Sequence, residues 1–129
     1  MSNDRAIRIE ADGVRVYAVL AATPTAEAIW EALPLEGKAQ RWGEEIFFNV
    51  ALDLQLEKDA RARVAVGDLG FWPSGPAIAL FFGPTPASGP DKTPTASSPV
   101  NIFGRITGDT SRLGRVRDGG KVRITRLEG

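Results

Sequence analysis

The side chains able to do chemistry in this chain are few, because its 129 residues include neither histidine nor cysteine. That absence excludes thiolate nucleophiles, disulfides, zinc sites built from Cys and His, and every Ser-His or Cys-His dyad. We therefore expect no metal and no cofactor. The remaining candidates are acidic, basic and aromatic side chains, and most of the aromatic ones lie in two stretches, residues 41–48 and 66–86.

Two adjacent carboxylates, Glu44 and Glu45, invite a general acid–base interpretation. Neighbouring residues on a strand point to opposite faces, so only one of the two is expected to enter a cleft. Paired-carboxylate catalysis is therefore disfavoured, and we assign Glu44 as the ligand-binding carboxylate. Asp68 is interpreted as a turn-capping residue, with ligand binding as the alternative.

Positive charge gathers near the C-terminus, although the whole chain has 16 basic and 16 acidic residues. The neutral total argues against general affinity for nucleic acid or for a membrane surface. Within residues 105–129 the basic side chains alternate with Val116, Val122 and Ile124, as they would on a half-buried strand. We interpret this segment as a solvated strand face, and an anionic-ligand patch is the alternative.

The length predicts a single domain over residues 1–129. Residues 1–6 lack the apolar core of a signal peptide, and no apolar run approaches the ~20 residues of a membrane span. We therefore expect a soluble, cytoplasmic protein without a membrane partner.

A β-hairpin is expected at the centre of the fold. Two extended runs, residues 66–72 and 77–82, flank a Pro73-Ser74-Gly75-Pro76 turn and carry Phe71, Trp72, Phe81 and Phe82. Period-two patterns predict further strands at residues 6–10, 14–20, 50–56, 60–66, 100–106 and 121–127.

One clear helix should follow the first hairpin. Thr23 fits the N-cap, Pro24 fits the first helical position, and the helix should end before Pro34. A single helical turn is expected within residues 107–114. Residues 84–99 hold five prolines and predict an exposed loop, mobile around residues 87–97, either a tolerated insertion or a lid. Many short antiparallel strands with one or two helices indicate a closed or nearly closed β-barrel.

Several segments resemble cyclophilins. Residues 23–30 are similar to the opening of the first cyclophilin helix, residues 101–106 with Gly108 to a strand near the C-terminus, and residues 80–82 to a central strand. Residues 41–48, 66–73 and 81–86 more closely resemble the small prokaryotic cyclophilin-like family of short barrels. The resemblance covers roughly residues 6–127 and implies a mainly β fold, a closed eight-stranded antiparallel barrel with one or two capping helices.

The same resemblance bears on Arg41. In true cyclophilins an arginine polarises the peptide carbonyl during prolyl isomerisation, and Arg41, ahead of Trp42 and Phe47, is its nearest counterpart here. That reaction needs an apolar slot and a fixed donor to lower a barrier of roughly 18–20 kcal/mol. Arg41 with a slot of Phe47, Phe82 and Phe103 would supply both. In the alternative interpretation Arg41 pairs with Glu44 or Glu45 and the aromatic residues are core.

Two functions follow as hypotheses. The first is a binding protein that takes a small molecule or a short peptide in an aromatic-lined pocket formed by Trp42, Glu44, Phe47, Trp72, Phe82 and Phe103. The second is a divergent prolyl isomerase that acts on proline-containing peptides through Arg41. Trp42 and Trp72 are expected at the wall or rim, since each indole N–H needs a partner. An exposed tryptophan could also anchor a dimer, and the sequence leaves the oligomeric state undecided.

Overall fold

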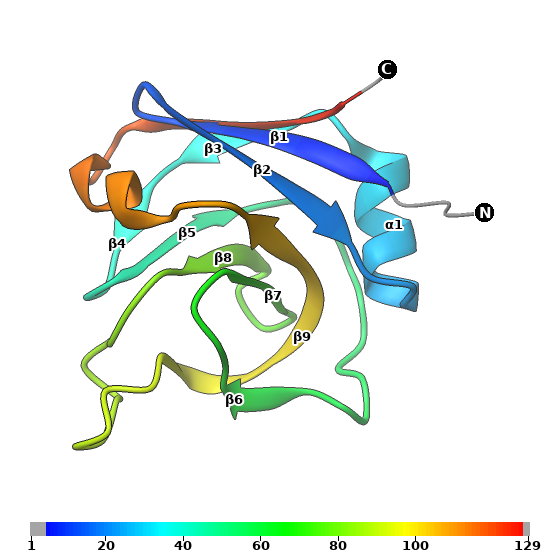
Figure 1. Cartoon of the computed structure of the whole chain (residues 1–129). Helices are drawn as coiled ribbons and strands as arrows, with labels where there is room; N and C mark the ends of the chain where they lie inside the picture. Colours follow the sequence, from blue (N-terminus) through cyan, green and yellow to red (C-terminus); the bar gives the residue numbers. More distant parts are fainter. Residues whose placement is uncertain (1–4, 128–129) are drawn as a thin grey trace.

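The computed structural model describes residues 5–127, and its main feature is one antiparallel sheet of ten strands (Figure 1). The strands are β1 (Ala6–Ala11), β2 (Val14–Leu20), β3 (Leu35–Lys38), β4 (Gln40–Arg41), β5 (Glu45–Asn49), β6 (Arg61–Arg63), β7 (Asp68–Trp72), β8 (Ala77–Phe81), β9 (Thr95–Thr107) and β10 (Lys121–Arg126). Their hydrogen-bonded order is β3-β10-β1-β2-β9-β7-β8-β5-β4, and β6 pairs separately with β9. One α-helix, α1 (Pro24–Ala32), and one 3₁₀ turn, η1 (Ser111–Arg115), complete the fold.

The predicted hairpins and helix are confirmed. β1 and β2 pair through a two-residue turn in which Asp12 and Gly13 have φ of 47° and 83°, as a tight hairpin requires. β7 and β8 form the second hairpin, around the proline-containing turn. Thr23 caps α1 by accepting a hydrogen bond from the Ala26 backbone N–H at 3.1 Å, and Pro24 is the first helical residue.

The two ends of the strand order are consecutive in the sequence. β3 pairs with β10 and β4 pairs with β5, and only Ala39 separates β3 from β4. No backbone pairing joins β3 to β4 within residues 5–127. The expectation of a mainly β antiparallel fold with a short helix is therefore confirmed. The closed eight-stranded barrel is not, because the sheet has ten strands and its pairing does not close within the described residues.

The strands β5, β8 and β7 carry apolar side chains on both faces. On one face Ile46, Phe71, Ile78 and Leu80 join the main core, which also packs against β1, β2, β10 and α1. On the opposite face lies a second, smaller cluster. It consists of Val64, Ala79, Phe81, Ala96 and Val100, with Phe47, Trp72 and Ile102 packed against them. The alternation along each strand sends successive residues to the two clusters.

The strand predicted over residues 50–56 is wrong. Leu52 and Leu54 do pack against the main core, but this segment is extended chain without a ladder partner. It is held instead by the buried Asn101 side chain, whose Nδ2 donates to the Gln55 carbonyl at 2.9 Å and whose Oδ1 accepts from the Glu57 N–H at 2.7 Å. Alternating burial therefore arises here without strand pairing.

The predicted loop over residues 84–99 is too long, because β9 begins at Thr95. The first part of β9 pairs with β6, from Arg63↔Thr95 to Arg61↔Val100, with a register irregularity between them. Pro99 is tolerated in that irregular stretch because it is not needed as a ladder donor. β6 itself is shorter than the predicted strand at residues 60–66. The mobility expected of residues 87–97 stays a prediction.

Figure 1 shows β9 bending around one side of the molecule, from β6 to β2. A register shift accompanies the bend, since Leu69 faces Gly104 whereas Gly70 faces Ile102. One extra residue on β9 is the signature of a β-bulge, which bends a strand away from its partner. The first half of β9 thereby leaves β7 and reaches the second cluster.

None of the helices described in residues 5–127 has the length and apolar character that a membrane span requires.

Candidate ligand-binding pocket

A pocket of about 250 Å³ lies beside the second cluster, on the face of β5, β8 and β7 that points away from the main core. It is mainly apolar and aromatic, with a few polar groups. Its lining consists of Trp42, Glu45, Phe47, Trp72, Ala77, Ala79, Ala96, Ser97, Ser98 and Val100.

The strand register explains why there is a hollow at this place. Ala77 and Ala79 of β8 put only methyl groups on this face, and both are buried. On one side Trp72 of β7 is the register partner of Ala77, and on the other Phe47 of β5 is the partner of Ala79. Small residues on the central strand thus form a floor between aromatic side chains on its two neighbours.

β9 supplies another side of the pocket through Ala96, Ser97, Ser98 and Val100. Its close approach depends on Gly70, since a Cβ placed there would lie 2.8 Å from Val100 Cγ2. Ser97 and Ser98 bring the hydroxyl groups of the lining, and each is able to donate or accept a hydrogen bond.

Glu45 is the ionisable residue in the lining. It is only 8% exposed, and its Oε1 is buried without a hydrogen-bond partner among the described residues. Burial raises the pKa of the Glu45 carboxyl from its usual 4.5 to about 7, because the charged form loses solvation. Near neutral pH this carboxyl is therefore divided between its protonated and charged forms.

The turn between β4 and β5 decides which of the two glutamates enters the pocket. The Trp42 N–H donates to the Glu45 carbonyl at 3.0 Å, and Gly43 adopts φ of +62° between them. Glu44 lies outside the lining and forms an ion pair with Arg41 Nη2 at 3.1 Å. The expectation that only one glutamate enters a cleft agrees with this geometry, but that residue is Glu45 rather than Glu44.

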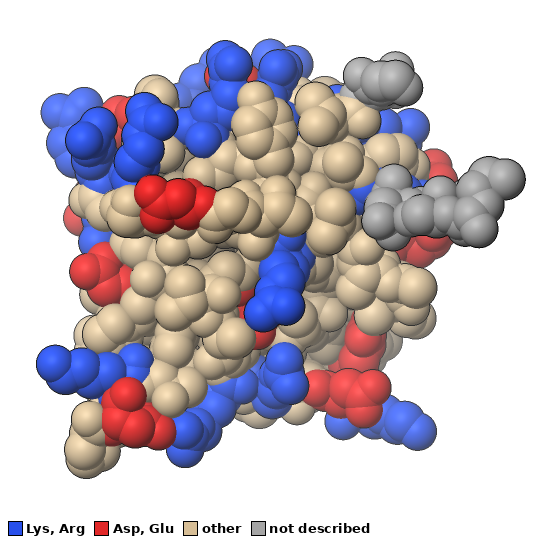
Figure 2. Space-filling model, in the orientation of Figure 1, with Lys and Arg blue, Asp and Glu red and all other residues tan. Residues whose placement is uncertain are grey.

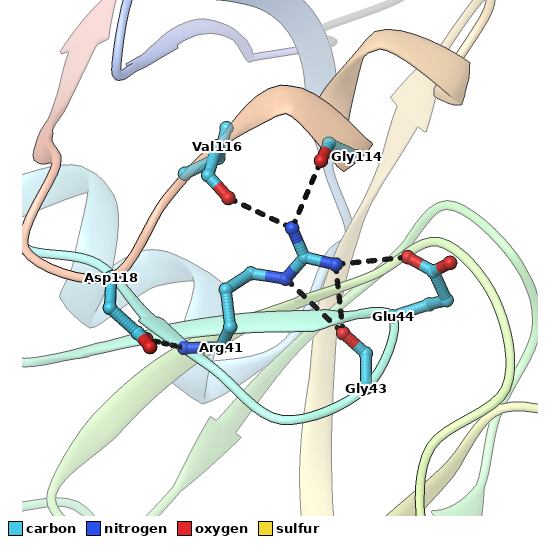
Figure 3. A network of polar contacts seen from close by, with 6 residues as sticks. All are labelled: Arg41, Gly43, Glu44, Gly114, Val116 and Asp118. Atoms are coloured by element: carbon cyan, nitrogen blue, oxygen red, sulfur yellow. Dashed lines mark hydrogen bonds and ion pairs between the residues drawn. The ribbon is translucent and has the colours of Figure 1, made fainter.

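Arg41 uses its whole guanidinium group within the protein (Figure 3). Nε and Nη2 donate to the Gly43 carbonyl, Nη1 donates to the carbonyls of Gly114 and Val116, and Nη2 also donates to Glu44. These bonds engage all five N–H donors of an arginine. The Arg41 backbone N–H donates to Asp118 at 2.7 Å. In this arrangement Arg41 links the β4–β5 turn to η1 and to the segment that follows it, and its predicted catalytic role stays a prediction.

Of the predicted site residues, the pocket brings together Trp42, Phe47 and Trp72. Phe82 lies apart from the lining and stacks against Arg41, whose Cζ is 5.2 Å from the ring centroid. Phe103 is fully buried in the main core. Among residues 5–127, no cluster of three or more His, Cys, Asp or Glu side chains is placed to hold a metal ion.

A comparison with protein families finds that residues 5–125 match the cyclophilin-like family. The chain belongs to the cyclophilin-like family. Among solved structures, it is similar to the solution structure of the hypothetical protein AF2241 from Archaeoglobus fulgidus, with 34% sequence identity and a TM-score of 0.80. That similarity covers 98% of this chain and 100% of the archaeal one. No curated protein matches the chain. The resemblance seen in the sequence motifs is thereby confirmed.

Sequence reasoning missed part of the lining of this cyclophilin-like pocket: Glu45, Ala77, Ala79, Ala96, Ser97, Ser98 and Val100. One sequence feature did indicate a hollow beside this strand. The run Ala77-Ile78-Ala79-Leu80 alternates small with large apolar residues, and such a strand leaves space on its small-residue face when its neighbours carry aromatic side chains. No comparable signal marked the serines, because their position depends on the bend of β9.

Four of the seven basic side chains in the C-terminal segment of this cyclophilin-like protein have an acidic or carbonyl partner among the described residues. Figure 2 shows Lys and Arg along the upper edge of the view, where Figure 1 places β1 and β10, with acidic side chains among them. Arg117 pairs with Asp12 at 3.0 Å, and Lys121 and Arg123 both approach Glu36. Arg126 donates to the Trp30 carbonyl at 2.8 Å. These contacts favour the interpretation as a solvated strand face over that of an anionic-ligand patch.

Proposed function

We propose that this cyclophilin-like protein binds a small molecule or a short peptide in the pocket beside β8. The observation that carries the proposal is the floor of Ala77 and Ala79 between Phe47 and Trp72, with Glu45 buried in the lining. Ligand sites are typically concave and mostly apolar, with a few placed polar groups that fix orientation.

The size of the pocket limits what it can hold. Its volume of about 250 Å³ lies just below the usual range for drug-sized ligands, roughly 300–1,000 Å³. A compact molecule with one ring, or one or two side chains of a peptide, matches this space. Trp42, Trp72 and Phe47 would contact the apolar part of the ligand, and Ser97, Ser98 and Glu45 would orient its polar part.

The three tryptophans make a direct test possible. Trp42 and Trp72 line the pocket, whereas Trp30 lies on α1 against Arg126, whose Cζ is 4.7 Å from its ring centroid. Protein labelled with 5-fluorotryptophan should give three ¹⁹F NMR signals, which single Trp→Phe variants assign. Titration with a panel of small amines, acids, alcohols, amides and proline-containing peptides should shift the Trp42 and Trp72 signals and leave the Trp30 signal in place.

Blocking variants show whether binding occurs in this pocket. Ala79→Leu fills the floor, and Ser98→Leu narrows the side formed by β9. Ala51→Leu is the matched control, because Ala51 is exposed and outside the lining. Both blocking variants should lose binding while keeping the circular dichroism spectrum of the unmodified protein, and Ala51→Leu should retain binding. A panel in which no compound shifts the pocket signals, or binding that survives both blocking variants, would contradict the proposal.

A further inference from the structure

We propose that the pocket selects organic cations, with the ammonium group of the ligand at the Glu45 carboxylate and its apolar part against Trp42, Trp72 and Phe47. This inference rests on the proposed function and names its ligand class. The cation can belong to a free amine or to a lysine side chain, since the chemistry recognised is the same in both.

The first support is the state of Glu45. Its carboxyl is buried, and Oε1 has no hydrogen-bond donor among the described residues. A buried acceptor left without a partner is costly, and a buried charge without a counter-ion costs more. A ligand ammonium would supply both an N–H donor and the opposite charge at this carboxylate, which lines the pocket.

The second support is that, in the part of the chain that the structure describes, no Lys or Arg stacks on the aromatic walls. The cation–π contacts described within residues 5–127 involve other rings: Arg5 and Arg126 stack on Trp30, and Arg41 stacks on Phe82. The rings of Trp42, Trp72 and Phe47 line the pocket, and none of them has such a partner among the described residues. Aromatic faces attract cations, and Trp does so most strongly.

The third support is that charges on the surrounding elements are already paired. Arg41 pairs with Glu44, Arg61 approaches Asp68 at 3.7 Å, and Arg63 pairs with Asp91 at 2.6 Å. None of these ion pairs includes Glu45, and Arg105, the single arginine of β9, lies beyond the part of that strand that lines the pocket. Burial raises the pKa of Glu45, and no cationic side chain within residues 5–127 lowers it.

This arrangement predicts the direction of a pH effect. A bound ammonium favours the charged carboxylate and expels the proton that Glu45 holds below about pH 7. Cation affinity should therefore rise between about pH 6 and about pH 8, with proton release on binding. A neutral ligand that accepts a hydrogen bond from protonated Glu45 should show the opposite trend, because it favours the protonated form.

The test compares two probes of similar size, benzylammonium and benzyl alcohol, by ¹⁹F NMR and by calorimetry. Benzylammonium should bind on the order of tenfold more tightly than benzyl alcohol at about pH 8, as expected for an ammonium placed on aromatic faces and at a carboxylate. Nα-acetyl-lysine N-methylamide tests the lysine source in parallel. Calorimetry in buffers of different ionisation enthalpy should detect the released proton.

Glu45→Gln keeps the shape of the side chain and removes its charge. In this variant the preference for benzylammonium and its pH dependence should both disappear, while benzyl alcohol still binds. Glu44→Gln is the matched control, one residue away and outside the lining, and should keep the preference.

Three results would overturn the inference: equal binding of the two probes, tighter binding of the alcohol, or a cation preference that persists in Glu45→Gln. In any of these three cases the proposed function still stands if a neutral compound shifts the ¹⁹F signals of Trp42 and Trp72. If no compound of either class binds, the proposed function fails as well. Circular dichroism of Glu45→Gln separates a lost preference from a lost fold.

Discussion

Asn101 Nδ2 lies 2.9 Å from Thr25 Oγ1, and this bond joins the middle of β9 to the first turn of α1. The same amide holds residues 55–57, and the Glu57 carboxylate in turn accepts from the Thr25 backbone N–H at 3.0 Å. A carboxylate at this end of a helix is also favoured by the helix dipole. A buried polar network thus replaces a strand ladder where residues 50–60 cross the molecule.

Replacing Asn101 by Ala should lower the free energy of unfolding by about 3 kcal/mol. The substitution leaves the Glu57 N–H and the Gln55 carbonyl without their partners in a partly buried setting, at a typical cost of about 1–3 kcal/mol for each orphaned group. Urea denaturation measures the change. Asn49→Ala is the control, since Asn49 is exposed, and it should cost less than about 1 kcal/mol. Equal losses in the two variants would show that the Asn101 network adds nothing specific.

Arg41→Lys should reduce stability by about 1–2 kcal/mol and leave ligand affinity unchanged. Lysine cannot reproduce the planar fork that reaches Gly43, Gly114 and Val116 together. Denaturation and the ¹⁹F titration measure the two effects, and Arg15→Lys, at an exposed position, is the control. Prolyl isomerisation in a protease-coupled assay, abolished by Arg41→Lys in folded protein, would instead assign Arg41 the catalytic role expected from the sequence resemblance.

The raised pKa of Glu45 predicts how stability depends on pH. The folded protein holds this proton up to about pH 7, whereas the unfolded chain releases it near 4.5. The contribution of Glu45 to folding is therefore most favourable below about pH 4.5, and it is lost as the pH rises through about 7. Glu45→Gln should gain stability relative to the unmodified protein by on the order of 2 kcal/mol between about pH 5 and about pH 8. A constant difference between the two proteins in denaturation at these pH values would contradict the buried, unpartnered state.

Gly43→Ala should destabilise the β4–β5 turn by at least about 1 kcal/mol. Gly43 has φ of +62°, and a Cβ there would lie 2.8 Å from Thr85 Cα, a backbone atom that cannot rotate away. Gly114→Ala is the control, because a Cβ at that position meets nothing within 4 Å. Thermal unfolding compares them, and a Gly43→Ala protein as stable as the Gly114→Ala protein would show that the turn relaxes without cost.

Much of the fold was predictable because local signals and tertiary structure agree. Asp12-Gly13 favours a tight turn, Thr23-Pro24 favours a helix start, and the alternation in β8 is that of a strand with two different faces. The strand prediction for residues 50–56 failed, because its leucines alternate as in a strand although the chain is held through Gln55 and Glu57 by Asn101. Asn101 lies 44 positions after Glu57. Sequence periodicity reports burial and carries no information on which group accepts the hydrogen bond.

The pocket was predictable only in part. Strand alternation predicts that only one of Glu44 and Glu45 enters a cleft, but β5 begins at Glu45 and Glu44 lies in the preceding turn, so the conformation of Gly43 decides which one lines the pocket. The five prolines of residues 84–99 predict irregular chain throughout, whereas β9 begins at Thr95. The last residues of this segment join β9, whose bend brings Ser97 and Ser98 to the pocket.

The alternation along β8 has a consequence for ligand binding. Ile78 and Leu80 lie in the main core, while Ala77 and Ala79 form the floor of the pocket. Substitutions at the even positions change stability, and substitutions at the odd positions change the depth and shape available to a ligand. The proposed binding function therefore implies that ligand preference can change through single substitutions of Ala77 or Ala79 on one strand, while the main core stays intact.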